Sequence, residues 1–320
     1  MKRPLACCLK GELADFLRYK RALGFRYERA EGTVRNFDQY VRRVQPPSPR
    51  RLDWRTLIRD WLARTQGRKS RTVAAELQLI RQFCLFRRRR DPGAFVPDRE
   101  WAREPAESGF LPHFFSVTEI RNLLQHIARR PGSSFQRRSH RLLLLVLYCT
   151  GLRFGEAARL RVGDLDLGRR LLWVRESKGR SRLVPFGADL AKEFRRYLRS
   201  RRTVQPPERE ALLVSFQGRA YSTRMISHTV RQWLRRAGLK AETGRVGPRP
   251  YDLRHSFAVE RLRRWYRRGD EVAGRLPWLS VYMGHANILG TETYLNATPE
   301  LLALTARRFK ARFRRRPNAR

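Results

Sequence analysis

A tyrosine that can serve as a nucleophile stands close to the end of the chain. Tyr294 follows His285 by nine residues, and the histidine comes directly after Met283-Gly284. A tyrosine phenol can form a covalent intermediate when neighbouring groups activate it. The same stretch also fits an ordinary corner between two helices with a packed tyrosine. The choice between these two interpretations depends on the residues that the rest of the chain brings to Tyr294.

Two arginines occur where the chain is expected to hold them rigidly. Arg153 comes two residues after Gly151, where a buried apolar helix is predicted to end, and Arg254 begins another predicted helix. A guanidinium fixed in this way suits bidentate binding of a phosphate. In a chain so rich in arginine, an ordinary surface position is the alternative for each. His255, which stands among apolar residues, is more simply explained as a structural histidine than as a catalytic one.

Lys178 is predicted at the tip of a β-hairpin. The β-prone segments 171–175 and 182–186 flank a turn at 176–181. The chain contains eight lysines in all, and a lysine, unlike an arginine, can give up a proton when its surroundings demand it. Lys178 is therefore a candidate for proton transfer, with a solvated turn lysine as the alternative.

An amphipathic helix is predicted from Ser222 to Gly238. Its apolar face consists of Ile226, Val230, Trp233 and Leu234. Its opposite face carries Arg224, His228, Arg231 and Arg235. Such a basic face can follow phosphates along a groove of a nucleic acid. A solvated helix face explains the pattern equally well.

The net charge of the chain points to a polyanionic partner. There are 71 Lys and Arg residues against 29 Asp and Glu residues, a formal charge of +42 with a pI near 11.6. Such a chain repels itself unless a polyanion neutralises it, and nucleic acid is the usual one. A GC-rich genome is the alternative source of 63 arginines. Because acidic residues are not enriched in parallel, nucleic-acid binding is favoured.

The elements that must position these residues fall into two groups. From Glu12 to Arg90 the apolar spacing predicts four short helices with basic outer faces. A stretch rich in Pro and Gly, from Asp91 to about Pro112, predicts a linker. Beyond it, the capping-box pattern Ser116-Val117-Thr118-Glu119 predicts the start of a helix. The apolar stripes of the four helices are Leu13, Phe16 and Leu17; Val34, Phe37, Tyr40 and Val41; Leu57, Ile58, Trp61 and Leu62; and Val73, Leu77, Ile80, Phe83 and Cys84.

Composition excludes several other classes of protein. The longest apolar run, Leu142 to Cys149, has eight residues and is too short to span a membrane, and no signal peptide is evident. The four cysteines form no CxxC pair, so a zinc site is not expected and reduced, structural cysteines are. These observations predict a cytoplasmic protein with no metal and no membrane association.

Taken in order, these motifs resemble the tyrosine recombinase (phage integrase) family. The resemblance rests on Thr150-Gly151-Leu152-Arg153-Phe154-Gly155-Glu156, Lys178, Leu253-Arg254-His255-Ser256-Phe257-Ala258, Met283-Gly284-His285 and Tyr294. It implies a mostly α fold with a small β-sheet. The expected parts are a helical core DNA-binding (SAM-like) domain at 8–92, a linker at 93–111, an α+β catalytic domain at 112–313 and a basic tail at 314–320.

The resemblance also implies a function and a set of site residues. The expected activity is site-specific DNA recombination or integration, in which DNA is cleaved and rejoined through a 3′-phosphotyrosine intermediate without a cofactor. The implied catalytic residues are Arg153, Lys178, Arg254, His285 and Tyr294. The expected DNA-binding residues are Tyr251, His255, Arg224, His228 and Arg231.

Each catalytic residue has an implied role. The two arginines would hold the scissile phosphate and stabilise its transition state, with Glu156 orienting Arg153. Tyr294 would attack phosphorus, Lys178 would protonate the leaving oxygen, and His285 would bind the phosphate or assist proton transfer. The nearby cations are expected to favour the phenolate form of Tyr294.

One residue departs from the family pattern. Three residues before the second arginine the family usually has histidine, whereas this chain has Tyr251. A phenol is a weaker general base than an imidazole near neutral pH, so proton transfer would fall more heavily on His285 and Lys178. Tyr251 also competes with Tyr294 for the role of nucleophile, as do Tyr266 and Tyr282.

Two other functions use the same residues. One is a type IB topoisomerase-like nicking-closing enzyme, and the other is a catalytically impaired DNA-binding member of the family.

The expected partner is double-stranded DNA, bound by a homo-oligomer (a tetramer) that could include other recombinases as subunits. The expected location is the bacterial cytoplasm, at the nucleoid. A short helix is predicted at Pro299 to Leu304. The basic residues from Arg307 to Arg320 are expected to pack on a neighbouring subunit or to form a DNA-binding arm.

Overall fold

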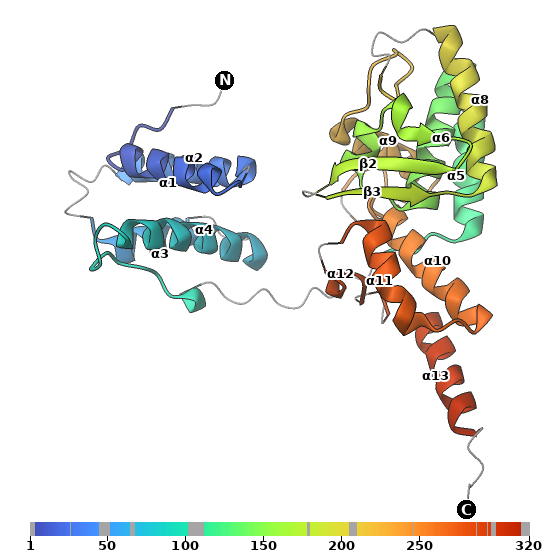
Figure 1. The fold of residues 1–320 in the computed structure, drawn as a ribbon. Coiled ribbons are helices and arrows are strands. Elements are labelled where there is room, and N and C mark those ends of the chain that lie inside the picture. The colour runs from blue at the N-terminus through green and yellow to red at the C-terminus, as the bar shows by residue number, and fades with distance from the viewer. Residues whose placement is uncertain are drawn as a thin grey trace, which may run out of the picture. The chain divides into compact units, whose positions relative to one another are not determined.

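The computed structural model describes most of the chain as two compact units. The described residues are 4–25, 27–44, 52–64, 68–101, 112–177, 180–204, 210–244, 246–285, 287–292, 294–295 and 299–314. The chain divides into Met1–Gly109 and Phe110–Arg320. Both units are mainly helical, and the second contains a small antiparallel sheet, as predicted from the sequence (Figure 1).

The first unit contains the four predicted helices. They are α1 (Lys10–Ala22), α2 (Glu28–Val44), α3 (Trp54–Ala63) and α4 (Ser70–Arg88), followed by the short 3-10 helix η2 (Arg99–Trp101). All the predicted apolar stripes lie in one core, with Tyr40 and Val73 at its edge. Aromatic rings lie at its centre, where Phe16 meets Phe83 edge-on at 5.5 Å and Phe37 meets Trp61 at 5.3 Å.

Part of the predicted linker belongs to this unit. Ala94 is buried, and Phe95, Val96 and Trp101 pack against the core of the four helices. Arg55 and Arg59 of α3 place their guanidiniums over the Trp101 ring at 5.9 and 5.6 Å. The segment was predicted as a linker because it begins with Pro and Gly residues, and its four apolar side chains show no helical periodicity. Residues 102–111 lie outside the described part of the chain.

The second unit contains nine described α-helices and the sheet. Its elements are α5 (Val117–Arg129), α6 (Ser134–Thr150), α7 (Phe154–Arg159), the 3-10 helix η3 (Val162–Asp164), β1 (Leu165–Asp166), β2 (Leu171–Ser177), β3 (Arg180–Pro185), α8 (Ala188–Val204), α9 (Thr223–Arg236), α10 (Asp252–Arg268), α11 (Val272–Met283), α12 (Leu289–Glu292) and α13 (Pro299–Arg314). The predicted capping box begins α5, where Ser116 Oγ accepts from the backbone N–H of Glu119 at 3.1 Å.

The sheet has the strand order β1-β2-β3 and is antiparallel throughout. Leu172 pairs with Val184, and these two side chains together with Val174 lie in the core. A register shift between Val174 and Ser177 precedes the hairpin turn. The two strands lie where the sequence predicted them, but the tip that carries Lys178 lies outside the described residues.

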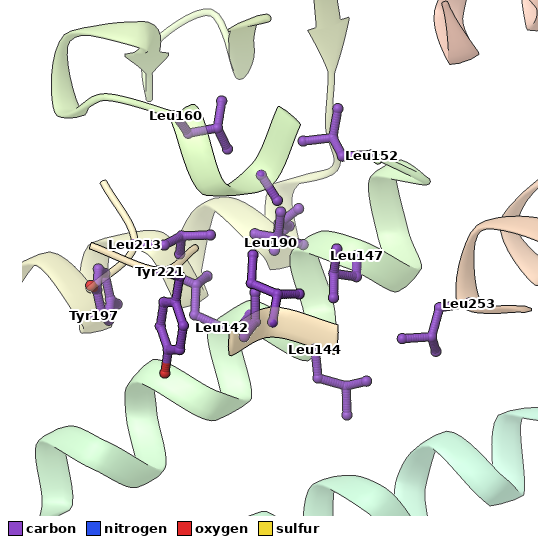
Figure 2. Packing of buried hydrophobic residues seen from close by; sticks show 14 of the residues in the cluster. Leu142, Leu144, Leu147, Leu152, Leu160, Leu190, Tyr197, Leu213, Tyr221 and Leu253 are labelled. Carbon is purple, nitrogen blue, oxygen red and sulfur yellow. The ribbon is translucent and has the colours of Figure 1, made fainter. Parts of the chain in front are cut away.

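Helix α6 is the centre of the core of this unit. Figure 2 shows Leu142 and Leu147 of α6 gathered with Leu190 of α8 and with Leu213. Tyr197 of α8 is buried in the same cluster and donates its hydroxyl to the carbonyl of Leu212 at 3.0 Å. The prediction of a buried apolar helix is therefore confirmed for this run up to Leu147.

A separate core holds the C-terminal helices together. Leu262 of α10, Leu276 of α11 and Leu301 of α13 are buried in it, and so is Tyr294. Helix α13 extends to Arg314, so the prediction of a helix that ends at Leu304 was too short. The basic residues after Leu304 continue the helix because arginine is a good helix former. In Figure 1, α13 projects from the end of the unit opposite the sheet.

The cysteines differ in their exposure. All four cysteines are free; Cys7 and Cys84 are buried, whereas Cys8 and Cys149 are exposed. The expectation of structural cysteines therefore does not hold for Cys8 and Cys149, which are exposed. Among the described helices, none combines the length and apolar character that crossing a membrane requires.

Gly151 provides a test of the junction between α6 and the next helix. It ends α6 with φ +61°, and a Cβ atom added there would lie 2.6 Å from Cδ1 of Phe257 in α10. Gly151→Ala is therefore expected to lower the free energy of unfolding by about 1–3 kcal/mol, through both the left-handed backbone and the overpacking. Urea denaturation followed by tryptophan fluorescence measures this. Gly187→Ala is the control, because no atom lies within 4 Å of its Cβ position; an equal loss in both variants would refute the close contact.

Candidate active site

Arg153 is held at the junction between α6 and α7. Gly151 allows the chain to turn, Leu152 is buried, and Arg153 then stands at the N-terminus of α7. The Glu156 carboxylate accepts the backbone N–H of Arg153 at 2.9 Å and its Nη1–H at 2.8 Å. The predicted support of Arg153 by Glu156 is therefore present as a direct ion pair.

Glu156 also binds an arginine that the sequence analysis did not select. Arg182 in β3 donates Nη1–H and Nη2–H to the two carboxylate oxygens of Glu156, at 3.1 and 3.0 Å. Its Nε–H donates to the carbonyl of Tyr282 at 2.7 Å. A sequence signal for this residue did exist: strand residues alternate between faces, so Arg182 shares the inward face of Val184.

Arg254 is the most deeply buried cation of the site. It lies in the first turn of α10 and is only 2% exposed. Its Nη1–H donates to the carbonyl of Gly151 at 2.5 Å, and its Nη2–H donates to the carbonyl of Met283 at 2.6 Å. The buried Nε–H has no acceptor among the described residues. A charged donor without an acceptor is costly to bury, so this guanidinium is suited to an incoming anion.

The two candidate phosphate-binding arginines converge on the end of α11. Arg153 donates Nη1–H to the carbonyl of Met283 at 3.4 Å and Nη2–H to that of Gly284 at 2.8 Å. Arg254 shares the Met283 carbonyl. The carbonyls at a helix C-terminus carry partial negative charge, so the ends of α6 and α11 hold both guanidiniums in place and partly offset their mutual repulsion.

Tyr294 is buried beside these arginines. It lies in the turn after α12 and is 5% exposed. Burial raises the pKa of the Tyr294 phenol to about 12, while the charges of Arg254 and Arg153 lower it by less. The nearby cations therefore favour the phenolate, as expected, but in the protein alone the loss of hydration outweighs their attraction.

Two histidines contact the Tyr294 ring. His255 Nδ1 lies 2.9 Å from the Tyr294 hydroxyl oxygen, and the two ring centroids are 5.5 Å apart. The His285 ring lies nearly parallel to the Tyr294 ring at 6.3 Å, and its Nδ1 hydrogen bonds with the hydroxyl of Thr291 at 2.7 Å. His255 was expected to be a structural or DNA-binding residue, but the turn of α10 places it against the candidate nucleophile.

Tyr251, which stands where the family usually has histidine, is more exposed than Tyr294. It is 38% exposed and turns the edge of its ring toward His255, with centroids 5.3 Å apart. Tyr282, another competing phenol, donates its hydroxyl to the carbonyl of Pro185 at 3.0 Å. Its ring stacks on Phe257 at 5.2 Å, so Tyr282 is held as a core residue.

Several predicted DNA-binding residues meet in one hollow. His228 and Arg231 of α9 line it together with Tyr251, and its volume is about 640 Å³. Arg235, Lys240 and Arg249 add further positive charge. The apolar face of α9 is fully buried, as predicted. Arg224 lies exposed at the start of α9 and does not line the hollow, and Lys178 lies outside the described residues.

The similarity to known proteins extends over most of the chain. The family model of the phage integrase family matches residues 113–300. The chain is 32% identical to a Sinorhizobium fredii protein provisionally named integrase/recombinase y4rE, over 92% of this chain and 93% of that protein. It is 30% identical to tyrosine recombinase XerA of Thermococcus kodakarensis, over 84% of this chain and 86% of that protein.

Two solved structures have a similar fold. The first is XerH site-specific recombinase bound to palindromic difH substrate, with a TM-score of 0.68 at 17% identity, covering 96% of this chain and 99% of that one. The second is the Tn1549 transposon integrase in complex with a circular intermediate DNA, also with a TM-score of 0.68, at 16% identity. That match covers 93% of this chain and 99% of the other.

The carboxylate between the two arginines can be tested by a neutral substitution. Glu156→Gln removes the charge that both Arg153 and Arg182 face, and a broken buried ion pair typically costs about 3 kcal/mol of stability. Glu210→Gln is the matched control, because the exposed pair between Glu210 and Arg161 at 3.3 Å should contribute less than about 1 kcal/mol. Urea denaturation of both variants measures the difference. Equal stability of the two variants would show that Glu156 does not hold the site together.

Proposed function

Because the chain belongs to the phage integrase family, we propose that it cleaves and rejoins DNA with Tyr294 as its nucleophile. The chain is a tyrosine recombinase by this membership, and the assignment of roles to its residues is our proposal. The observation that carries the proposal is the shared carbonyl of Met283, which brings the guanidiniums of Arg153 and Arg254 together. Both guanidiniums lie close enough to Tyr294 for their charges to lower the pKa of its phenol.

The two arginines are suited to the non-bridging oxygens of the scissile phosphate. In the transition state, phosphorus has five oxygen neighbours and the non-bridging oxygens carry extra negative charge. Donors that are already oriented stabilise this charge without reorganisation. Arg254 has a buried Nε–H without an acceptor among the described residues, and Arg153 is held beside it by Glu156.

The covalent step exchanges one phosphodiester for another. The Tyr294 oxygen forms a bond to phosphorus, and the bond from phosphorus to the 5′ oxygen breaks. The products are a 3′-phosphotyrosine and a free 5′-hydroxyl. The bond energy is retained in the intermediate, so a 5′-hydroxyl can attack it and reseal the strand without a cofactor.

The leaving oxygen needs a proton when it departs. We assign this role to Lys178, which lies between β2 and β3 in the sequence, since a lysine can release a proton near neutral pH when its surroundings favour the neutral form. His285 is proposed to assist at the phosphate, because its ring lies against that of Tyr294.

The hollow beside Tyr251 is proposed to receive the DNA backbone next to the cleavage site. His228 and Arg231 would contact phosphates there, and Tyr251 would stand between this hollow and the phenol of Tyr294. Arg224 would reach a phosphate further along α9. His255 would lie at the junction between the hollow and Tyr294. Such contacts position the duplex without reading its sequence.

Recombination needs two duplexes, so we propose that several copies, in the simplest case four, assemble on DNA. Of the two solved structures with a similar fold, XerH is bound to difH substrate and the Tn1549 integrase is in complex with a circular intermediate DNA. A nicking-closing enzyme of the topoisomerase IB type would use the same chemistry on one duplex. Formation of a Holliday junction or of recombinant product from two labelled duplexes distinguishes the two functions.

Replacing the nucleophile tests the covalent step. A nicked suicide substrate loses the fragment that carries the 5′-hydroxyl and so traps the covalent complex. Wild type is expected to form a protein–DNA adduct that resists denaturation, and Tyr294→Phe to form none while it still shifts DNA in a gel. Tyr282→Phe is the control and should retain the adduct. An adduct formed by Tyr294→Phe would assign the nucleophile to another residue, and DNA binding without any wild-type adduct would indicate an impaired member of the family.

Removing a positive charge from the hollow tests whether the hollow binds DNA. Arg231→Gln is expected to weaken binding similarly on all sequences and to reduce the slope of log K against log salt by about one, since each neutralised phosphate releases about one counterion. Arg195→Gln, on the exposed side of α8, carries the same charge change and should leave the slope unaltered. Fluorescence anisotropy at several salt concentrations measures both. Equal slopes for the two variants would exclude Arg231 from the interface.

A further inference from the structure

The catalytic residues implied by the family resemblance do not explain which group accepts the proton of Tyr294. Tyr251 occupies the position of the usual histidine, and a phenol accepts a proton poorly near neutral pH. Nδ1 of His285 is engaged by the hydroxyl of Thr291. We propose that His255 is the general base that takes the proton of Tyr294 during cleavage, an inference that rests on the proposed role of Tyr294 as nucleophile.

The geometry of His255 suits this role. Its Nδ1 lies 2.9 Å from the Tyr294 oxygen, within the 2.6–3.2 Å or so that direct proton transfer requires. His255 follows Arg254 in the first turn of α10, so a single helical turn carries both a phosphate-binding group and the base. The ring packs between Tyr251 and Tyr294, with centroids at 5.3 and 5.5 Å, and these contacts limit its rotation.

The surroundings of His255 keep it neutral. Burial lowers the pKa of His255 below its ordinary value of 6.5; the charges of Arg249 and Arg254 lower it further, and Asp252 opposes them. The Asp252 carboxylate is itself turned toward Arg249, whose backbone N–H it accepts at 2.8 Å. Near pH 7 the ring is therefore a neutral imidazole. Its Nδ1 accepts the bond from the phenol when its own proton is on Nε2.

The proton transfer must accompany bond formation. The pKa of Tyr294 is raised to about 12 and that of His255 is below 6.5, so the proton stays on the phenol until its oxygen bonds to phosphorus. As that bond forms, the phenolic proton moves to Nδ1, and the bond from phosphorus to the 5′ oxygen breaks, with that oxygen protonated by the acid of the site. In resealing, the 5′-hydroxyl gives its proton back to the acid of the site as its oxygen bonds to phosphorus. The bond from phosphorus to the Tyr294 oxygen breaks, and Tyr294 takes its proton back from His255.

His255→Asn tests this role in the full-length protein on the nicked suicide substrate. An Asn amide can occupy the region of Nδ1 but cannot accept a proton, so the adduct is expected to form about 10²- to 10⁴-fold more slowly at saturating protein. The wild-type rate should fall as pH is lowered through the pKa of His255, and this decline should be lost in the variant. His126→Asn, at an exposed position on α5, is the matched control and should keep the wild-type rate and profile.

A second substrate distinguishes a general-base role of His255 from a general-acid role. A duplex with sulfur in place of the bridging 5′ oxygen has a leaving group that needs no proton, so it bypasses a general acid only. The defect of His255→Asn is expected to persist on this substrate, and recovery of the rate would instead assign His255 to the leaving group. A wild-type rate for His255→Asn, or a loss of DNA affinity with an unchanged rate at saturation, would also refute the proposal.

Further controls separate a failure of this inference from a failure of the proposed function. If wild type forms the adduct and Tyr294→Phe does not, the function stands whatever His255→Asn does. If wild type forms no adduct, both proposals fail. Thermal unfolding of His255→Asn confirms that it is folded, and His255→Gln replaces it in the same assays if it is not.

Discussion

The active-site region depends on one buried carboxylate. Glu156 holds Arg153 and Arg182 on either side, and through them it joins the start of α7, strand β3 and the end of α11. Such a cluster brings little net stability, because three charged groups must lose their hydration. It does fix directions, since bidentate pairs allow a single arrangement of the planar groups. The proposed phosphate-binding arginine is thus oriented by a second arginine that does not need to contact the substrate.

Helix ends supply the other half of this support. The carbonyls of Gly151, Met283 and Gly284 accept the guanidinium protons of Arg153 and Arg254. Each helix ends in a glycine with positive φ, at +61° and +66°, which exposes the last carbonyls to a neighbouring side chain. Two adjacent cations are thereby stabilised by helix dipoles rather than by further carboxylates. Their positive potential thus remains available to an anion.

Burial has opposite effects on the two groups of the proposed reaction. It raises the pKa of Tyr294 and lowers that of His255, so both are neutral in the resting protein. A phenol kept neutral in this way is protected from reacting until a phosphate is bound against the arginines. The same loss of hydration strengthens the attraction between the arginines and the transition state. The activation of Tyr294 is thus proposed to follow from a base in contact with it rather than from the cations alone.

The sequence by itself determined the four helices of the first unit, several helices of the second, the hairpin strands, the buried face of α9 and the family, because apolar periodicity and short motifs are local properties. It also identified Arg153, Arg254, His285 and Tyr294 as candidates. Only the tertiary structure decided that Arg182 meets Glu156, that segment 94–101 packs on the first core, that α13 continues past Leu304 and that His255 touches Tyr294. His255 and Tyr294 are separated by 39 residues, and Arg153 and Gly284 by 131. Contacts over such separations depend on how helices and strands pack, and on the loss of hydration at each side chain, neither of which the residue pattern encodes.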